Sequence, residues 1–443
     1  MARPPPPNPI PTGLLEIKNQ QLLSYNPKIS AVAAIAALAL AGCASSGSDS
    51  GGAAADPANL ETTIKILAPS YADSTKADWE AIIAEYNKTY PKVKVELQIE
   101  GWDDFSSKVQ ARVQAKDFPD ILNDNNFASA ADGGLLYPIT EVMSEDVLKT
   151  IEPALLKNGV GADGTQWVVP DVASARMMAY NTGIFEKAGI TAVPASWDEL
   201  EQACDKIKAA APDVYPYGMP LGREEAQVES SLWLWGAGGD WAEGDELKAK
   251  SDKTVEAFTE MKKLIDKGCT QPNAGTSNRQ DVADLFNNGK VAMMMSHSGL
   301  LGVTAKDYPE IKYDVAPVPS KDGKGVALGV TDFILAFDNG DDARKQATKG
   351  FLDLFYSDAM YQNWYAPSGL LPVTGGIIEK GKSAAGPIDK KFYEALSAVQ
   401  FLPVGNPQWD ILQGALQSSA GTVTSENPAA VLDAIQSEVD AQS

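Results

Sequence analysis

Histidine is almost missing from this chain of 443 residues, in which His297 is the only one. Nucleophilic triads depend on a histidine base, and zinc centres commonly use imidazole ligands. His297 lies between two serines, but neighbours on a strand point to opposite faces, so these residues do not form a nucleophile–base pair. The composition argues against conventional hydrolase chemistry. We predict no catalytic residue, no metal and no cofactor, and interpret His297 as a structural or pocket-lining residue.

Positive charge is also scarce, because 37 lysines and arginines stand against 59 aspartates and glutamates, which leaves a net charge of −22. Nucleic-acid binding needs a basic face that displaces counterions from phosphates. No stripe of Lys and Arg interleaved with aromatic residues occurs in the chain. The sequence therefore argues against DNA or RNA as a partner, and we interpret the acidity as a contribution to solubility.

Residues 29–40 form an apolar run that is too short to cross a bilayer but has the length of a signal-peptide core. Lys28 precedes the run, and Leu-Ala-Gly leads from it to Cys43. This pattern resembles the lipobox of bacterial lipoproteins, in which Cys43 would carry lipid and become the mature N-terminus. An ordinary secretory signal is the alternative, and it would leave Cys43 as an odd thiol.

The segments on either side of this run differ in composition. Residues 1–26 are long and proline-rich for the start of a signal peptide, so we attribute them to a misassigned start codon or foreign sequence. We expect residues 1–42 to be a leader. Residues 43–61 would hold the lipid attachment and a flexible tether, because residues 44–57 are rich in Ser, Gly and Ala.

Three cysteines occur in the chain. If Cys43 carries lipid, Cys204 and Cys269 remain as a pair in an oxidising compartment, where a disulfide is the default. Cys204 falls on a helix that begins with a capping-box spacing, and Cys269 follows a glycine at the end of another helix. We expect these two to form a disulfide, with two buried free thiols as the alternative.

The rest of the chain is long enough for two domains and alternates between strand and helix patterns. Strands are predicted at 64–67, 93–99 and 121–122, with helical stripes between them, and a long apolar strand at 326–337. The same alternation returns after residue 177. This order is typical of an α/β protein whose mostly parallel sheet is covered by helices.

Two segments match motifs that their context argues against. Residues 376–383 fit the phosphate-loop pattern G-x-x-x-x-G-K-[ST], but prolines interrupt the segments before and after them, so we predict an exposed loop. Residues 338–342 suggest a calcium loop, yet the EF-hand spacing and its closing glutamate are absent. We expect a solvated turn there that caps the next helix.

Seven short motifs, taken in order, resemble the maltose-binding-protein-like extracellular solute-binding proteins that serve bacterial ABC importers. They are WDDF at 102–105, AKDFPDI at 115–121, GTQWVVP at 164–170, AYN at 179–181, PASWDEL at 194–200, LWGAGGD at 234–240 and FNNGKVAMM at 286–294. Each motif is loose by itself, but their order and spacing behind a lipobox are specific. The resemblance runs from Thr62 to the C-terminus.

The resemblance implies an α/β fold of two discontinuous lobes, joined by a hinge of crossing strands, with a ligand cleft between them. Lobe one would comprise residues 62–169 and 328–373, and lobe two residues 172–324 and 374–443. It also implies a monomer that binds a mono- or oligosaccharide and works with membrane permease subunits. Its lipid anchor would hold it on the outer face of the bacterial cell membrane.

Sugars present hydroxyl groups and apolar C–H faces, so a sugar cleft uses flat aromatic rings beside carboxylates and amides. The ligand-binding residues expected from the family's cleft are Trp102, Asp124, Asn125, Trp167, Arg176, Trp233, Trp235, His297, Gly299, Asp332, Phe333, Tyr365 and Trp409. Trp364 is a further candidate. For each tryptophan, packing in a core is the alternative.

Asp332 is notable because it interrupts the apolar strand at 326–337, where a carboxylate needs a partner. A ligand hydroxyl or an arginine would serve. Arg176 and Arg223 could be such partners or could bind an acidic sugar, and the residues alone leave both uses open.

The best interpretation is a binding protein for an importer, and two alternatives stay open. A secreted carbohydrate-active enzyme would show hydrolysis or lyase activity, although plentiful carboxylates are no evidence for one. A structural or adhesive surface lipoprotein would bind no small soluble ligand.

Overall fold

The computed structural model describes residues 56–243 and 246–442. The predicted leader, Cys43 and most of the predicted tether lie outside these residues. Within the two described ranges, no helix combines the length and the apolar character that a membrane span requires.

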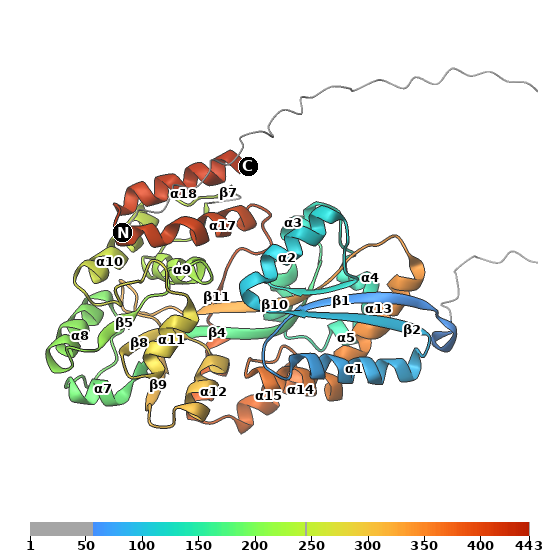
Figure 1. The fold of residues 1–443 in the computed structure, drawn as a ribbon, viewed down its shortest axis with the longest axis horizontal. Helices are drawn as coiled ribbons and strands as arrows, with labels where there is room; N and C mark the ends of the chain where they lie inside the picture. Colours follow the sequence, from blue (N-terminus) through green and yellow to red (C-terminus); the bar gives the residue numbers. More distant parts are fainter. Residues whose placement is uncertain (1–55, 244–245, 443) are drawn as a thin grey trace, which may run out of the picture. The chain divides into compact units, whose positions relative to one another are not determined.

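One mixed sheet of nine strands runs through the fold in the order β2-β1-β3-β10-β4-β8-β5, with β11 beside β10 and β9 beside β4 (Figure 1). The strands are β1 (Thr62–Pro69), β2 (Val93–Glu100), β3 (Ile121–Asp124), β4 (Val169–Asn181), β5 (Tyr215–Gly218), β8 (Val291–Ser296), β9 (Tyr313–Ala316), β10 (Leu328–Ala336) and β11 (Gln400–Phe401). A separate hairpin joins β6 (Ala242–Glu243) to β7 (Glu246–Leu247).

Helices cover both faces of this sheet (Figure 1). They are α1 (Thr75–Thr89), α2 (Trp102–Ala115), α3 (Ala128–Asp132), α4 (Ile139–Val142), α5 (Glu145–Leu148), α6 (Pro153–Leu156), α7 (Thr182–Lys187), α8 (Trp197–Ala210), α9 (Ala226–Gly236), α10 (Asp252–Asp266), α11 (Arg279–Asn287), α12 (Ser298–Asp307), α13 (Asp342–Phe355), α14 (Asp358–Tyr365), α15 (Gly375–Ala384), α16 (Pro387–Ala395), α17 (Trp409–Ser419) and α18 (Pro428–Gln442). Short 3₁₀ turns are η1 (Pro57–Asn59), η2 (Lys157–Gly159), η3 (Ala366–Ser368) and η4 (Ala420–Thr424).

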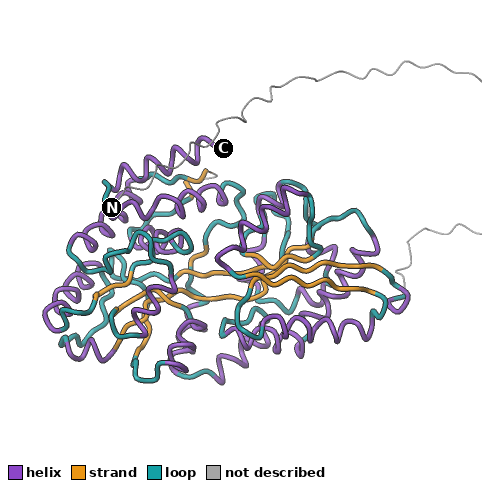
Figure 2. Tube along the Cα trace, viewed as in Figure 1, coloured by secondary structure: helices purple, strands orange, loops and turns teal. Residues whose placement is uncertain are grey.

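Two long strands join the two halves of the sheet. From Val169 to Arg176, β4 pairs with β10, and from Met177 to Asn181 it pairs with β8 and β9. The first lobe is built on β1, β2 and β3, which are parallel, and the second on β5 and β8, which are parallel to each other. Figure 2 shows β4 and β10 running between these two groups of elements. The predicted two-lobed α/β fold is confirmed, although the connecting strands β4 and β10 pair antiparallel with each other and with β3, β8 and β9, and only the short β11 lies parallel to β10.

Alternation along the strands assigns each side chain to one of the two sheet faces. In β1, Ile64 and Ile66 belong to one hydrophobic core, and Leu67 belongs to another. In β10, Ile334 lies in the first of these cores and Phe333 in the second. Both faces of the sheet are therefore buried, as expected for parallel strands between helix layers.

The hydrophobic cores of the two faces differ in extent. On one face, a single cluster runs through both lobes, from Trp79 on α1 to Phe286 on α11. On the other face, one cluster around Phe105 and Phe127 covers the first lobe, and a separate cluster around Trp233 covers the second. The second face therefore has a break in its apolar packing, located where the two lobes meet.

Several local predictions can be compared with the structure. Cys204 on α8 and Cys269 after α10 form the predicted disulfide, and Ser196 caps α8 in a capping box with Glu199. Asp341 caps α13 by accepting hydrogen bonds from two backbone amides, as expected for the turn at 338–342.

The prediction of an exposed loop at 376–383 is wrong, because these residues lie on α15. A phosphate loop offers free backbone amides ahead of a helix. In this chain the whole motif lies within the helix, and the amides of Ile377 and Ile378 donate to the carbonyl of Thr374.

Candidate functional site

Buried polar side chains fill the break between the two cores on the second face. Asp124 is the last residue of β3, Ser174 and Arg176 project from β4, and Asp332 projects from β10. Each is between 5% and 8% exposed. Side chains an even number of residues apart on a strand point to the same face of the sheet. Asp124 therefore shares a face with Leu122 of the first-lobe core, and Asp332 shares a face with Leu328 of the second-lobe core.

Further members of this polar cluster come from loops at the carboxyl ends of the parallel strands. In the first lobe, Tyr71 follows β1 and Trp102 follows β2. In the second lobe, Glu224 and Glu225 lie in the loop after β5, and His297 follows β8 directly. Ligands of open α/β sheets bind outside the carboxyl ends of their strands. Here the strand ends of both lobes supply side chains to one cluster.

Two arginines in the cluster are held by two glutamates. Nη2 of Arg176 lies 3.1 Å from Oε1 of Glu225, and both side chains are buried. Arg279, the first residue of α11, pairs with Glu224, and its Nε lies 3.4 Å from Oε1 of Glu225. Buried charges of this kind persist only when they are paired.

His297 extends this ion-pair network. Nη1 of Arg279 lies 2.8 Å from Nε2 of the imidazole, and because a guanidinium only donates, Nε2 must be the acceptor. The ring is then neutral and carries its proton on Nδ1. Burial and the charges of Arg176 and Arg279 lower the pKa of His297 well below its usual value, in agreement with a neutral ring.

Two carboxylates of the cluster, Asp124 at the end of β3 and Asp332 on β10, have raised pKa values. Burial raises the pKa of Asp332 to about 6, against the hydrogen bond from the hydroxyl of Tyr71 and the charges of Arg176 and Arg279; that hydrogen bond is 2.7 Å long. Burial raises the pKa of Asp124 to about 7, although the backbone amide of Asn125 opposes the rise. Both groups can accept hydrogen bonds from a ligand and exchange protons near neutral pH.

Several buried atoms of the cluster have no hydrogen-bond partner in the protein. They include Nε and Nη1 of Arg176, Nε of Arg279, Oε2 of Glu225 and Nδ1 of His297. Oε1 of Gln227 is a further one, and Nε2 of this residue donates to the carbonyl of Glu224 at 3.3 Å. Leaving a buried donor or acceptor unpaired costs about 1–3 kcal/mol. The set includes both donors and acceptors, which is the pattern that a ligand bearing hydroxyl groups satisfies, because each hydroxyl donates and accepts.

Aromatic rings stand beside the carboxylates. The ring of Tyr71 makes edge contacts with Trp102 at 5.7 Å and with Trp364 at 5.8 Å between centroids. Nε1 of Trp364 donates to Oδ1 of the buried Asp171 at 2.6 Å. Trp364 is itself 3% exposed, so Tyr71 and Trp102 are the rings of this group that a ligand can reach.

Polar contacts link the lobes at two places near the cluster. Ser129 on α3 donates to Asp410 on α17, and the hydroxyl of Ser298 on α12 donates to the carbonyl of Gly369 at 2.8 Å. Asp410 also acts electrostatically on Asp124, whose pKa it helps to raise. The strand ends of both lobes are therefore brought close together in this conformation.

The structure brings five of the expected ligand-binding residues into the cluster, namely Trp102, Asp124, Arg176, His297 and Asp332. Two others adjoin it. The amide of Asn125 donates to Asp124 at 2.7 Å, and Gly299 packs so closely on η3 that an added Cβ would lie 2.9 Å from the carbonyl of Ser368.

The remaining expected residues lie elsewhere in the packing. Trp233, Trp235 and Trp409 are 1%, 5% and 0% exposed and belong to the second-lobe core. Phe333 packs on Phe127. Tyr365 stacks on Tyr361. The indole of Trp167 donates to Asp163. Phe333 pairs with Asp124 through the backbone of the β3–β10 ladder, while its ring packs in the first-lobe core. Ligand contact by any of the thirteen residues stays a prediction.

Sequence reasoning missed Tyr71, Glu224, Glu225, Gln227 and Arg279. The strand at 64–67 was predicted, so the position of Tyr71 just beyond its carboxyl end was an available signal. The strand before the two glutamates, β5, was not predicted. Arg279 comes from the start of a helix, where no local pattern indicates a site.

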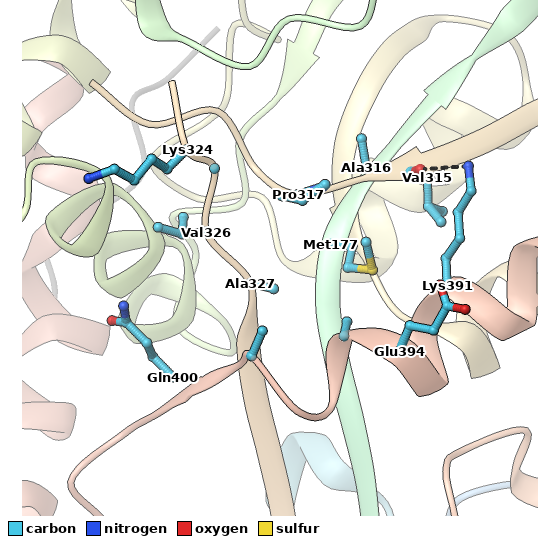
Figure 3. A pocket seen from close by; sticks show the side chains of 13 residues that line it. Met177, Val315, Ala316, Pro317, Lys324, Val326, Ala327, Lys391, Glu394 and Gln400 are labelled. Carbon is cyan, nitrogen blue, oxygen red and sulfur yellow. Dashed lines mark hydrogen bonds between the residues drawn. The ribbon is translucent and has the colours of Figure 1, made fainter. Parts of the chain in front are cut away.

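A groove of about 520 Å³ lies beside β4 (Figure 3). Met177, whose side chain alternates with that of Arg176, lines it together with α16 and the segments before β10 and β11. Lys391 reaches along its rim to the carbonyl of Val315 at 3.2 Å. In the part of the chain that the structure describes, no group of three His, Cys, Asp or Glu side chains could hold a metal ion.

A two-lobed sheet whose strand ends converge on a buried polar cluster is the arrangement expected of a solute-binding protein. The chain matches the family model of the bacterial extracellular solute-binding proteins over residues 70–362, and it belongs to this family.

Curated relatives agree with this assignment, and a solved structure shares the fold. The diacetylchitobiose-binding protein DasA of Streptomyces coelicolor is 26% identical over 332 residues, which is 70% of this chain and 74% of DasA. The sn-glycerol-3-phosphate-binding periplasmic protein UgpB of Rhizobium meliloti is 23% identical over 347 residues, 71% of this chain and 75% of UgpB. An ABC transporter solute-binding protein from Thermotoga lettingae, solved with α-D-tagatose, has a TM-score of 0.72 at 22% identity and covers 86% of this chain and 99% of its own.

Proposed function

We propose that this protein captures a sugar or oligosaccharide outside the cytoplasm and delivers it to the permease of an ABC importer. The observation that carries the proposal is the buried polar cluster between the lobes, whose unpaired donors and acceptors a polyhydroxyl ligand would satisfy. The neighbouring rings of Tyr71 and Trp102 offer surfaces for the apolar faces of a sugar. The relatives named for binding diacetylchitobiose and sn-glycerol 3-phosphate support a small polar solute.

The proposed ligand-binding residues are those of the cluster. Asp124 and Asp332 would accept hydrogen bonds from hydroxyl groups, whereas Arg176 and His297 would donate to them. Glu225 and Gln227 would accept from the second lobe. Because the contributions come from both lobes, a bound sugar would favour the closed arrangement of the lobes.

The proposal includes an anchored, non-enzymatic protein. Cys43 would carry the lipid, residues 44–57 would serve as tether, and the lobes would comprise residues 62–169 with 328–373 and residues 172–324 with 374–443. Near the last of these boundaries, the amide of Gly375 still donates to the carbonyl of Thr150 at 2.9 Å, so the chain is close to the first lobe at that point. Substitution of Cys43 by Ser should release the protein from membranes.

A thermal-shift screen over neutral mono- and oligosaccharides tests the proposal, because a ligand that binds only the folded state stabilises it by mass action. We expect at least one sugar to raise the melting temperature in a concentration-dependent way and to be recovered unchanged. Recovery of cleaved sugar would favour a carbohydrate-active enzyme. Stabilisation by no sugar would favour the structural lipoprotein.

A further inference from the structure

The charges of the polar cluster are balanced within the protein. Arg176 is paired with Glu225, and Arg279 contacts both Glu224 and Glu225. The imidazole of His297 accepts from Arg279 and is neutral. The positive charges of the two arginines are therefore balanced by the negative charges of the two glutamates, and Asp124 and Asp332 are not needed for this balance.

This balance bears on the charge of the ligand. An arginine that binds a phosphate or carboxylate presents a bidentate fork to the anion. Here Nη2 of Arg176 is already occupied by Glu225, and the remaining donors, Nε and Nη1, lie in the field of that same carboxylate. An anion entering the cluster would meet no unbalanced positive charge and would lose its hydration.

The unpaired acceptors point to the same conclusion. Oε2 of Glu225 and Oε1 of Gln227 are buried and without a donor, and the buried Asp124 on β3 and Asp332 on β10 add further carboxylate oxygens. A phosphate dianion or a carboxylate group has no proton to donate to them. A hydroxyl donates to one of these oxygens while it accepts from Arg176 or His297.

We propose that Glu224 and Glu225 set the charge selectivity of this site, so that it accepts uncharged polyhydroxyl ligands and rejects sugars that carry a phosphate or a carboxylate. The inference rests on the proposed function and narrows its substrate class. It also assigns Arg176 to an ion pair rather than to the recognition of an acidic sugar. Glu224 and Glu225 act through the arginines as well as through their own charge.

Arg223 offers a competing route for an acidic ligand. It precedes Glu224 in the loop after β5 and is exposed, unlike Arg176. If an acidic sugar bound through Arg223, the variant Arg223→Ala would lose that binding while keeping the binding of neutral sugars. This variant therefore separates selectivity set in the buried cluster from recognition at its edge.

The first experiment is calorimetric titration of the full chain with matched neutral and acidic pairs. Suitable pairs are galactose with galacturonate, N-acetylglucosamine with its 6-phosphate and glycerol with sn-glycerol 3-phosphate, all at one ionic strength. We expect every detectable binder to be neutral and its acidic partner to bind at least about tenfold more weakly, which corresponds to about 1.4 kcal/mol. An acidic member that binds as tightly as its neutral partner would overturn the inference, and Arg223→Ala would then show whether Arg223 holds it.

The second experiment does not depend on knowing the sugar. Inorganic phosphate, with chloride at matched ionic strength as reference, is added to the wild type and to Glu225→Gln and Glu224→Gln in a melting assay. Each variant leaves an arginine charge unbalanced, so we expect phosphate to raise the melting temperature of the variants and not that of the wild type. Glu145→Gln, which alters an exposed glutamate on α5, is the matched control and should gain nothing.

The outcomes of the second experiment separate the two claims. Stabilisation of the wild type by phosphate, equal to that of the variants, would overturn the charge selectivity. Folded Glu224→Gln and Glu225→Gln proteins that gain no phosphate response would do the same. If the buried Glu225→Gln variant does not fold, Glu224→Gln, whose glutamate is 23% exposed, carries the test alone. Failure of all sugars, with the phosphate response present in the variants, would refute the sugar proposal and leave the charge selectivity intact.

Discussion

At the scale of single residues, the carboxylates of the cluster are the groups whose surroundings differ most from water. Asp124 closes β3 and Asp332 interrupts β10, and both are more than nine-tenths buried. Burial disfavours their ionised forms, which is why their pKa values are raised to about 7 and about 6. A buried carboxylate of this kind can accept a hydrogen bond from a ligand that donates to it.

Replacing Asp124 by Asn should weaken sugar binding about ten- to a hundredfold, because the amide accepts one hydrogen bond fewer and presents donors to the ligand. Thermal melting without ligand should not fall, since the variant no longer has to bury a carboxylate. Asp358→Asn, on the exposed start of α14, is the control. Unchanged affinity in a folded Asp124→Asn protein would remove Asp124 from the proposed site.

The raised pKa of Asp332 predicts how the free energy of unfolding changes with pH. The folded protein holds this proton more tightly than the unfolded chain between its ordinary pKa of 3.8 and about 6. The free energy of unfolding of the wild type should therefore fall, relative to Asp332→Asn, as the pH rises through this window. The change should reach up to about 3 kcal/mol, because one pKa unit corresponds to about 1.4 kcal/mol.

Urea denaturation of both proteins at pH 4 and pH 7 measures this difference. The groups that act on Asp332 or are acted on by it, which are Tyr71, Asp124, Asp171, Arg176 and Arg279, are present in both proteins. A pH-independent difference in stability between the two would contradict a raised pKa at Asp332.

Trp233 serves as the contrasting residue, because sequence reasoning assigned it to the ligand and the structure buries it. Its indole donates to Glu229 at 2.8 Å within the second-lobe core. Trp233→Phe should lower the free energy of unfolding by about 1–3 kcal/mol, since it removes one of the two hydrogen bonds to Oε1 of the buried Glu229 and leaves only that from Tyr217. Sugar affinity should stay unchanged. Chemical denaturation and calorimetry on one preparation measure both; a loss of affinity at constant stability would restore Trp233 to the site.

How far the predicted site residues coincide with the polar cluster depends on the residue type, for a physical reason. Asp332 was identified because a carboxylate within an apolar strand has to be explained by a partner, whichever fold surrounds it. Tryptophan carries no such requirement, because a large apolar ring with one donor suits a core and a sugar surface equally well. The sequence could therefore not separate Trp102, which lies at the cluster, from Trp233, Trp235 and Trp409.

At the scale of helices and strands, the local patterns predicted the elements at the end of the sheet formed by β2, β1 and β3. The strands and helical stripes between Ile64 and Leu122 correspond to β1, α1, β2, α2 and β3. Long β4 escaped pattern reasoning because residues 169–181 are buried on both faces and include Asp171, Ser174 and Arg176, so they show no alternation of apolar and polar residues. The failed loop prediction at 376–383 gave too much weight to the flanking prolines, which lie outside α15.

The disulfide acts between two elements, because it links α8 covalently to the turn after α10. A bond between residues 65 apart should stabilise the protein by at most about 4 kcal/mol, on the chain-entropy argument. The double variant Cys204→Ser with Cys269→Ser should therefore unfold at lower urea concentration and retain its affinity for sugar, because neither cysteine belongs to the cluster.

Thiol labelling supplies the control for this prediction. The native wild type, without reductant, should show no alkylation at Cys204 or Cys269. Alkylation of both, or equal stability of the wild type and the double variant, would contradict the disulfide as a stabilising bond.

At the scale of the whole described chain, the decisive feature is that one sheet face has a continuous core and the other has two cores with charges between them. The continuous face gives the two lobes a common support. The divided face leaves a polar surface to which both lobes contribute. Ser129 with Asp410 and Ser298 with Gly369 form further polar contacts between the lobes. No local sequence pattern predicts such a surface, because its residues come from segments more than 200 positions apart, such as Tyr71 and Asp332.

The central claim is that a sugar is held at this cluster by both lobes at once. Hydrogen exchange of the full chain, with and without the sugar that gives the largest thermal stabilisation, tests it most directly. We predict added protection at the end of β3, residues 121–127, together with protection in the loop at 221–227 and around 296–299, because ligand contacts and lobe closure slow local opening there. Protection confined to one lobe, or centred on the groove beside Met177 and α16, would contradict the claim.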